Sequence, residues 1–336
     1  MLNRSNVSDN AVVETEGRNQ FLPVSLKLAG LLLALCLVPL VTHFLDRGNY
    51  VLHIFSTVYL YMLLALGLNV VTGFTGLLDL GYVGFYLVGG YTAGLLMVRM
   101  GLSYWFALPI AAIHGAIWGL LRGAPTLRLT GDYFAIVTFG FSELLFRIVK
   151  NEEWLIGGPN GFVNDIPPPV ILGIELYQYW QQYYHILILL LVTLIVVYRL
   201  QFSRVGRAWK AISQDEEAAQ TMGIGLYEYK SLAFAISGAI GAVGGAFFAQ
   251  FQVNISAGVF EFWESILILC MIVLGGMGTI RGSLVGAAIL GSLGEVLRIL
   301  LSILKLPADS RYLIFGLILV LMMRFRPSGI LTDNPK

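Results

Sequence analysis

Charged residues are scarce in this sequence. Asp, Glu, Lys and Arg make up only 12% of the 336 residues, about half of the roughly 25% that is typical of a soluble domain. Hydrophobic residues make up 57% of the chain, and the formal net charge is +1. A deficit of charge over so long a chain points to lipid as the surrounding solvent. Because a nucleic-acid-binding face needs clustered Lys and Arg, we expect no nucleic acid partner.

Residues that carry enzyme chemistry are also few and dispersed. The two cysteines, Cys36 and Cys270, lie inside apolar runs, where free cysteines usually act as small buried hydrophobes. The four histidines are too scattered to suggest a metal site. The sequence holds no H-E-x-x-H, G-x-S-x-G or G-x-x-x-x-G-K-[ST] motif, so it cannot bind and hydrolyse ATP through a phosphate loop. We therefore predict no catalytic residue, no bound metal and no cofactor held by this chain.

Long apolar segments dominate what is present. A helix needs about 20 mostly apolar residues to cross a bilayer, and the sequence predicts an all-α, polytopic bundle of about ten spans. The predicted spans are residues 28–45, 51–71, 77–97, 104–121, 133–149, 183–198, 231–251, 262–278, 284–303 and 312–323.

The distribution of positive charge predicts the orientation. Cytoplasmic loops of membrane proteins are enriched in Lys and Arg, and with the N-terminus inside most of these residues fall in cytoplasmic segments. Those segments would hold Arg122, Arg128, Arg199, Arg204, Arg207, Lys210, Arg281, Arg324 and Arg326. Both termini are therefore predicted to be cytoplasmic.

The predicted domain organisation is simple. Residues 1–27 are expected to form a polar cytoplasmic tail, because they lack the apolar core and cleavage site of a signal peptide. Residues 28–330 are expected to form a single transmembrane domain. Two long polar loops interrupt it, an outer loop at residues 151–182 and a cytoplasmic loop at residues 201–230.

Glycine is abundant, and one glycine-rich segment suggests a broken helix. Pairs such as Gly241 and Gly245 are typical of close helix packing in lipid. Residues 73–84 instead suggest irregular backbone between two spans, which transporters use to bind substrate through free N–H and C=O groups. The candidate translocation-pathway residues are Asn69, Gly73, Thr75, Gly76, Asp79 and Gly81. For Asp79 the alternative is a structural carboxylate held by neighbouring N–H groups.

The cytoplasmic loop predicts two short helices. Val205, Ala208, Trp209 and Ile212 recur at helical spacing. Ser213 followed by Glu216 fits a capping box, which predicts a second helix over residues 214–222 that ends at Gly223. An ordinary capped loop helix would have the same local sequence.

Several sequence blocks together resemble one transporter family. They are GLNVVTG at 67–73, GLLDLGYVGFY at 76–86, LRLTGDYFAIVT at 127–138, GGPNG at 157–161, GRA at 206–208, DEEAA at 215–219 with Gly223, and VLGGMG at 273–278. Their order and content resemble the M-type (LivM-like) permeases of branched-chain amino acid ABC transporters, over nearly the whole chain after Leu28.

The resemblance implies a function and a set of partners. It implies a permease subunit of an ATP-driven importer of branched-chain or other neutral amino acids in the bacterial inner membrane. The implied partners are a homologous second permease, two ABC ATPase subunits that use the ATP, and a periplasmic amino acid binding protein. The implied ATPase-coupling residues are Asp215, Glu216, Glu217, Ala218, Ala219 and Gly223. From the topology, the binding protein would dock at Gly157, Gly158, Pro159, Asn160 and Gly161.

Three alternatives remain open at this point. A secondary carrier would use Asp79 or Glu143 as its coupling-ion site. A permease of the same wider family would carry another small solute, such as urea. A membrane-embedded enzyme has the least support, because the sequence lacks its motifs.

Overall fold

The computed structural model describes residues 35–42, 48–126, 131–152, 161–171, 173–304, 307, 310–325 and 329–331. The chain divides into two compact units, residues 1–53 and residues 54–336. In the first unit the described residues are a helical segment at 35–42 and the start of the long helix α3. Every feature discussed below lies in the second unit. Most of the first predicted span (residues 28–45) and all of the predicted polar tail (residues 1–27) lie outside the described residues.

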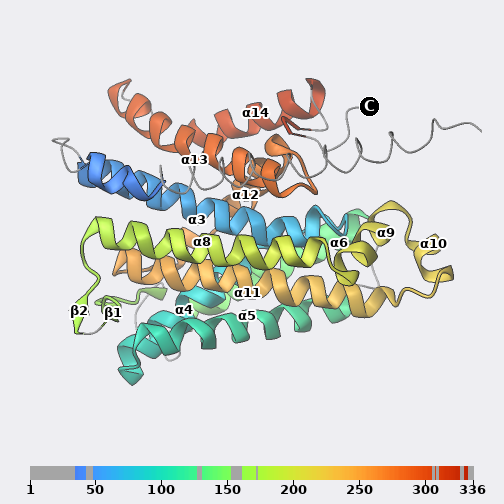
Figure 1. Ribbon diagram of the computed structural model, residues 1–336, viewed down its shortest axis with the longest axis horizontal. Coiled ribbons are helices and arrows are strands. Elements are labelled where there is room, and N and C mark those ends of the chain that lie inside the picture. The colour runs from blue at the N-terminus through green and yellow to red at the C-terminus, as the bar shows by residue number, and fades with distance from the viewer. Residues whose placement is uncertain are drawn as a thin grey trace, which may run out of the picture. The chain divides into compact units, whose positions relative to one another are not determined.

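Helices make up almost all of the described chain (Figure 1). They are α3 (Gly48–Thr72), α4 (Val83–Met100), α5 (Tyr104–Thr126), α6 (Asp132–Asn151), α8 (Tyr179–Gln201), α9 (Arg204–Gln214), α10 (Glu216–Thr221), α11 (Leu226–Gln252), α12 (Phe262–Gly275), α13 (Ile280–Ile303) and α14 (Ser310–Phe325), with a 3₁₀ turn η2 (Ala257–Phe260). The predicted all-α class needs one small correction, because the predicted outer loop contains an antiparallel hairpin of β1 (Val170–Ile171) and β2 (Ile174–Glu175). Gly173 turns this hairpin with a φ of +83°.

Seven helices among the described residues are long and apolar enough to cross a membrane. They are α3, α4, α5, α8, α11, α13, and α12 together with the turn before it. The predicted spans at α6 and α14 are helices as well, but α6 carries four charged residues from Asp132 to Lys150 and α14 has only 16 residues. The chain is thus multi-pass, while the count of about ten and the orientation with both termini inside stay predictions.

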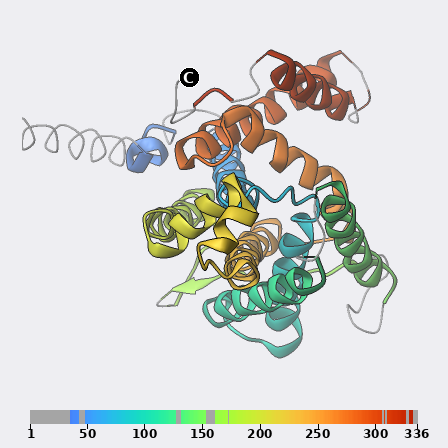
Figure 2. The same cartoon turned by 90° about the vertical axis from the view of Figure 1, so that its right-hand side faces the viewer.

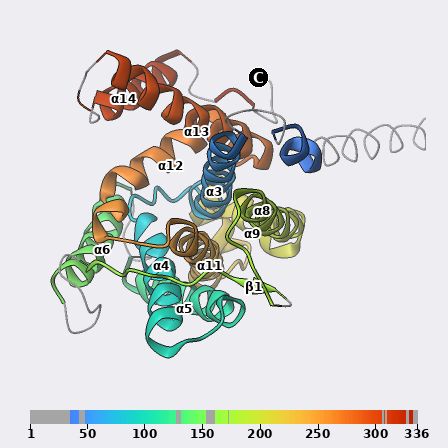
Figure 3. The ribbon, with the colours of Figure 1, turned by 90° about the vertical axis from the view of Figure 1, so that its left-hand side faces the viewer.

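Glycines allow α11 to pack closely against its neighbours. Helix α11 makes its most extensive contacts with α4 and α5 (Figure 3). A Cβ atom at Gly89 of α4 would overlap the backbone of Ala242, and one at Gly115 of α5 would overlap Gly238. In lipid, where apolar side chains gain little from leaving the solvent, such close contact is a main attractive force between helices. The helix α11 is therefore a central element of the second unit.

Two predicted spans extend beyond the helix into irregular backbone. The span predicted to begin at residue 77 begins as a helix only at Val83. The span predicted to reach residue 278 ends at Gly275, because Gly276 and Gly278 adopt φ values of +121° and +79°. Both errors mark breaks in the helices, and the two breaks turn out to contact each other.

Candidate functional site

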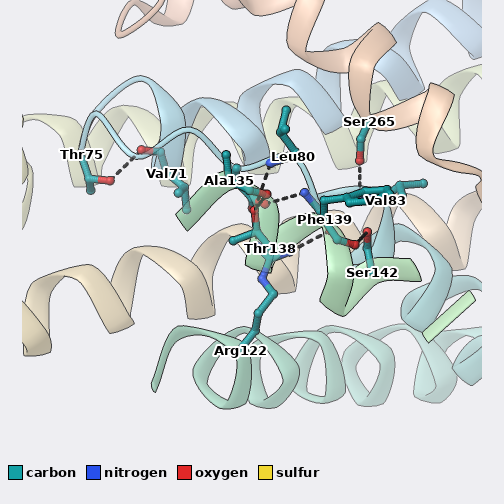
Figure 4. Close-up of polar contacts among 12 residues, drawn as sticks. Val71, Thr75, Leu80, Val83, Arg122, Ala135, Thr138, Phe139, Ser142 and Ser265 are labelled. Carbon is teal, nitrogen blue, oxygen red and sulfur yellow. Dashed lines mark hydrogen bonds and ion pairs between the residues drawn. The ribbon is translucent and has the colours of Figure 1, made fainter. Parts of the chain in front are cut away.

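The segment between α3 and α4 is an irregular strap held by side chains from distant helices. The amide of Leu80 donates a hydrogen bond to Thr138 Oγ1 of α6 at 3.3 Å. The amide of Val83 donates to Ser265 Oγ of α12 at 2.9 Å, and Figure 4 shows both contacts. We call residues 73–82 the strap. Irregular backbone within a membrane protein persists where its polar groups find partners, and here the amide of Leu80 in the strap bonds to α6, while that of Val83, the first residue of α4, bonds to α12.

A buried ion pair links the strap to α5. Asp79 is fully buried and pairs with Arg122 of α5, whose side chain is 1% exposed. Asp79 Oδ1 also accepts the amide of Gly81 at 2.8 Å, and Arg122 Nη1 donates to the Gly81 carbonyl at 2.8 Å. The Arg122 guanidinium lies 4.0 Å from the centroid of the Phe85 ring. The pair therefore ties the strap to α5 with charge, hydrogen bonds and an aromatic contact.

The last turn of α3, directly before the strap, contacts the second helix break. Asn69, one turn before the end of α3, is fully buried. Its Oδ1 accepts the amide of Gly278 at 3.0 Å, and its Nδ2 donates to the carbonyl of Thr279 at 3.4 Å. A Cβ atom at Gly73 would meet the amide nitrogen of Gly278 at 2.5 Å, so only glycine fits there without movement. The two breaks, 209 residues apart at Asn69 and Gly278, form one packed junction.

The predicted pathway residues divide into two groups. Asn69, Thr75 and Asp79 are buried and hydrogen-bonded within the chain, Thr75 through its hydroxyl to the Val71 carbonyl at 2.7 Å. Among the glycines, Gly81 is buried, Gly73 is half-buried and Gly76 is exposed. For Asp79 the geometry is that of the structural alternative, a carboxylate held by a neighbouring N–H group and an arginine. The pathway role of these residues stays a prediction.

The same geometry bears on the ion-coupled alternative. That alternative needs a carboxylate at Asp79 or Glu143 that can take up a coupling ion. In the structure Asp79 pairs with Arg122, and Glu143 Oε1 pairs with Arg147 Nε at 2.7 Å. Each carboxylate already has a cationic partner, so the structure lends this alternative no support.

Helices α9 and α10 form a hairpin beside the ends of α8 and α11 (Figure 2). The predicted capping box is wrong in its cap residue. Asp215, not Ser213, starts α10, and its Oδ1 accepts the Ala218 amide at 2.9 Å. Ser213 still belongs to α9 and donates its hydroxyl to the Lys210 carbonyl at 2.9 Å.

The predicted end of α10 is confirmed. Gly223 has a φ of +82°, its amide donates to the Gln220 carbonyl at 3.0 Å, and the Ile224 amide donates to the Ala219 carbonyl at 3.1 Å. These two bonds form a Schellman motif, which needs a left-handed residue at the position of Gly223. Asp215 and Gly223 thus bound an independent helix of six residues.

The hairpin is anchored to the bundle and to the strap. Lys230 of α11 is buried and pairs with Glu216 at 2.6 Å. Trp209 of α9 is fully buried, donates Nε1 to the Tyr229 carbonyl at 2.8 Å, and stacks on Phe74 of the strap at 6.4 Å between ring centroids. The hairpin therefore contacts both α11 and the strap.

The predicted coupling residues consequently lie on two faces of α10. Glu216 and Ala219 face inward, since Glu216 pairs with Lys230 and Ala219 is 4% exposed. Glu217 and Ala218 are exposed, as is Met222 at 83%. We call the exposed set Glu217, Ala218, Gln220, Thr221, Met222 and Gly223 the α10 outer face. An exposed methionine on a rigidly anchored helix is suited to contact with a partner protein.

Comparison with known proteins identifies the family. The family described as branched-chain amino acid transport system / permease component matches residues 50–323. The chain belongs to this family. It is 36% identical over 324 residues to the high-affinity branched-chain amino acid transport system permease protein LivM of Salmonella typhimurium, covering 89% of this chain and 74% of the relative. It is 38% identical over 295 residues to LivM of Escherichia coli K12, covering 81% of this chain and 68% of the relative.

A second member of the permease family is also related. The chain is 26% identical over 297 residues to the permease protein LivH of Escherichia coli K12, covering 81% of this chain and 91% of the relative. The match to this permease family spans α3 to α14, so it includes the strap, the α9–α10 hairpin and both helix breaks.

The predicted binding-protein docking loop is only partly described. Gly157, Gly158, Pro159 and Asn160 lie outside the described residues. Gly161 has a φ of +71°, and its carbonyl accepts the Tyr91 hydroxyl of α4. This contact attaches the end of the predicted docking loop to the permease helices, and the docking role itself stays a prediction.

Sequence reasoning misses three residues of this site. The positive-inside rule places Arg122 in a cytoplasmic segment, yet it is buried against Asp79. Nothing in the sequence singles out Lys230 and Trp209 as anchors of the hairpin. For Arg122 the available signal is an arginine directly at the end of an apolar segment, combined with a lone aspartate in the preceding helix break.

Proposed function

We propose that this chain is the transmembrane permease subunit of an ATP-driven importer for branched-chain or other neutral amino acids. Membership of the branched-chain amino acid permease family supports it, as do the names of the LivM relatives. The observation on which the proposal depends most is the α10 outer face, an exposed helix surface that is anchored to the bundle and in contact with the strap. The chain would lie in the bacterial inner membrane as a single transmembrane domain.

The proposed partners follow from the division of labour in such an importer. The relationship to LivH supports a second, homologous permease. Two ATPase subunits would supply the energy, since this chain carries no phosphate loop. A periplasmic amino acid binding protein would deliver the substrate, docking at residues 157–161.

The proposed mechanism is a two-state switch of the helices. A zwitterionic amino acid cannot cross hydrocarbon cheaply, because its charges lose their hydration. The permease must therefore open a polar path to one side at a time. ATP binding would move the ATPase subunits, which would press on the α10 outer face. The Glu216–Lys230 pair and the Trp209–Phe74 stack would pass that movement to α11 and to the strap.

The test is ATP-dependent uptake of radiolabelled leucine. Vesicles would contain this chain with its candidate partner subunits and the binding protein, with and without ATP. We expect uptake that requires ATP and that is abolished by Glu217→Lys, because a reversed charge on the α10 outer face opposes docking. Co-purification of the ATPase subunits would be measured in parallel. The matched control is Glu175→Lys, an exposed carboxylate on β2, which should retain the ATPase subunits.

Uptake driven by an ion gradient without ATP would refute the proposal and support a secondary carrier. ATP-dependent uptake of a different small solute would keep the mechanism and change only the substrate.

A further inference from the structure

Helix α6 lies at the edge of the second unit, beside α4 and α12 (Figure 3). It has 20 residues and is therefore about 30 Å long, which matches the thickness of the hydrocarbon core of a bilayer. One side of α6 packs on these two spans. The Phe139 ring lies 4.4 Å from that of Phe262 on α12, and a Cβ atom at Gly84 of α4 would lie 3.2 Å from Ser142 Cβ. The length and the contacts favour a position of α6 within the membrane.

The other side of α6 is exposed and mostly apolar. Exposed and buried residues recur along the helix with the helical period, so α6 has two distinct faces. We call the uncovered set the α6 outer face, which consists of Ile136, Val137, Gly140, Glu143, Leu144 and Arg147. Ile136 is 62% exposed and Leu144 is 63% exposed. Apolar exposure alone does not identify a partner, because lipid tails are as apolar as these side chains.

An ion pair lies within this apolar surface. Glu143 Oε1 accepts a hydrogen bond from Arg147 Nε at 2.7 Å, and the arginine side chain is 65% exposed. Glu143 is in the middle part of α6, about 12 Å from the nearer end at Asn151. A long cationic side chain that faces lipid usually extends to the headgroups. Arg147 instead reaches back toward Glu143, away from the nearer end of the helix.

The combination of apolar side chains and an ion pair suits neither lipid nor water. Ionisable side chains in membrane helices almost always face the interior of a helix bundle, yet this pair lies on the outside of the described chain. Water would solvate the pair but would leave the large apolar side chains around it exposed. The surface of another membrane protein meets both requirements. At Gly140 no atom lies within 4 Å of an added Cβ, which leaves room for the close approach of another helix.

We propose that the α6 outer face is the surface through which this chain contacts a second, homologous permease, which places a carboxylate or carbonyl oxygen opposite Arg147. The inference rests on the proposed function, in which a second permease is one of the partners. The other proposed partners, the ATPase subunits and the binding protein, lie outside the membrane and do not reach the middle of α6. Among contacts within the described residues Arg147 uses only its Nε, so its two terminal nitrogens are left to donate to the partner.

The first experiment uses Gly140→Trp, with Gly316→Trp on α14 as the matched control. At both glycines an added Cβ meets no atom within 4 Å, so both positions have space within the chain. This chain would be expressed with the candidate homologous permease and the ATPase subunits and purified through a tag on this chain. Because an indole ring prevents close helix packing, we expect Gly140→Trp to lower the recovered second permease by about tenfold or more, and Gly316→Trp to change it by less than about twofold. Equal recovery with both variants would overturn the assignment.

A second measurement keeps the assignment testable if Gly140→Trp does not fold. Leu144 and, as a control, Val192 of α8 would each be replaced by the photoreactive residue p-benzoylphenylalanine in the complete importer. The two positions are 63% and 53% exposed. We expect the probe at Leu144 to form an adduct with the homologous permease, identified by mass spectrometry, and the probe at Val192 to form little. An adduct at Leu144 with a second copy of this chain or with lipid alone would overturn the assignment, as would equal adducts at both positions.

The outcomes separate the two proposals. If the wild-type importer takes up leucine with ATP and the Leu144 probe forms no adduct with the second permease, the interface is overturned and the proposed function stands. If the adduct forms in an assembly that takes up no leucine with ATP, the interface stands and the proposed function is overturned.

Discussion

Replacing Asp79 by asparagine should destabilise the permease strongly while barely changing its shape. The side-chain carbonyl of the introduced asparagine can still accept the Gly81 amide, which now donates to Asp79 at 2.8 Å. The substitution removes only the negative charge beside Arg122, whose side chain is 1% exposed. Breaking a buried ion pair by removing one partner typically costs about 3–5 kcal/mol, because the other charge stays buried and uncompensated. Arg122 keeps the Gly81 carbonyl and the Phe85 ring, so we expect the lower end, about 3 kcal/mol.

The assay is unfolding of the purified chain in mixed micelles with increasing dodecyl sulfate, followed by circular dichroism. The matched control is Glu143→Gln on α6, which breaks the exposed pair with Arg147. Exposed pairs at this helical spacing contribute only about 0.3–0.5 kcal/mol, so the control should unfold almost as the wild type does. The contrast isolates burial as the cause, since both substitutions remove one carboxylate charge from an arginine.

A double-mutant cycle completes the argument. If the cost of Asp79→Asn comes from the unpaired Arg122, then adding Arg122→Gln should cost little more, and the coupling energy should exceed about 2 kcal/mol. A loss below about 1 kcal/mol for Asp79→Asn, or simple additivity of the two substitutions, would refute the reasoning. Asp79 would then be free to act on the transported substrate rather than on the strap.

Three further predictions concern coupling, capping and packing. Phe74→Leu removes the ring that stacks on Trp209, so ATP hydrolysis by the complex should persist while leucine uptake falls several-fold. An equal loss of both activities would contradict this. Asp215→Ala removes the cap of α10 and should cost about 1 kcal/mol, seen as roughly fivefold faster amide hydrogen exchange in α10 and unchanged exchange in α11. Gly89→Val should prevent stable insertion, since even a Cβ overlaps Ala242, whereas Gly140→Ala should be tolerated because no atom lies within 4 Å of the added Cβ. The amount of folded protein recovered from membranes distinguishes Gly89→Val from Gly140→Ala.

Most of the long helices could be predicted from the sequence alone. The predicted spans at α3, α5, α8 and α11 differ from the helices by a few residues at each end. A bilayer imposes a minimum apolar length, so apolar runs identify such helices without knowledge of their neighbours. The prediction failed at the start of α4, because residues 77–82 are as apolar as a helix would be. Their irregular backbone depends on Arg122 and Thr138, and the start of α4 on Ser265, and the sequence does not show that these residues are adjacent.

The site was predictable in outline and not in detail. The glycine content of the strap indicated a broken helix, and the structure has one between α3 and α4. The role of Asp79 depended on a partner 43 residues away in sequence, and the positive-inside rule placed that partner in a loop. In the α9–α10 hairpin, Ser213 and Asp215 are both good cap residues. Only the length of α9, which includes Ser213, decides between them.

The Asp79–Arg122 pair and the α9–α10 hairpin are connected, because both contact the strap. An irregular strap can transmit movement only if it does not deform, and a buried, hydrogen-bonded ion pair is costly to break once formed. The strap is fixed to α5 by Asp79 and Arg122 and to α6 by Thr138, and the next residue, Val83 of α4, is held to α12 by Ser265. At its other end Phe74 contacts Trp209, and a Cβ atom at Gly76 would lie 3.4 Å from Ser213 Cβ. A push on the α10 outer face would therefore reach α5 and α6 through the strap, and α12 through Val83, the first residue of α4.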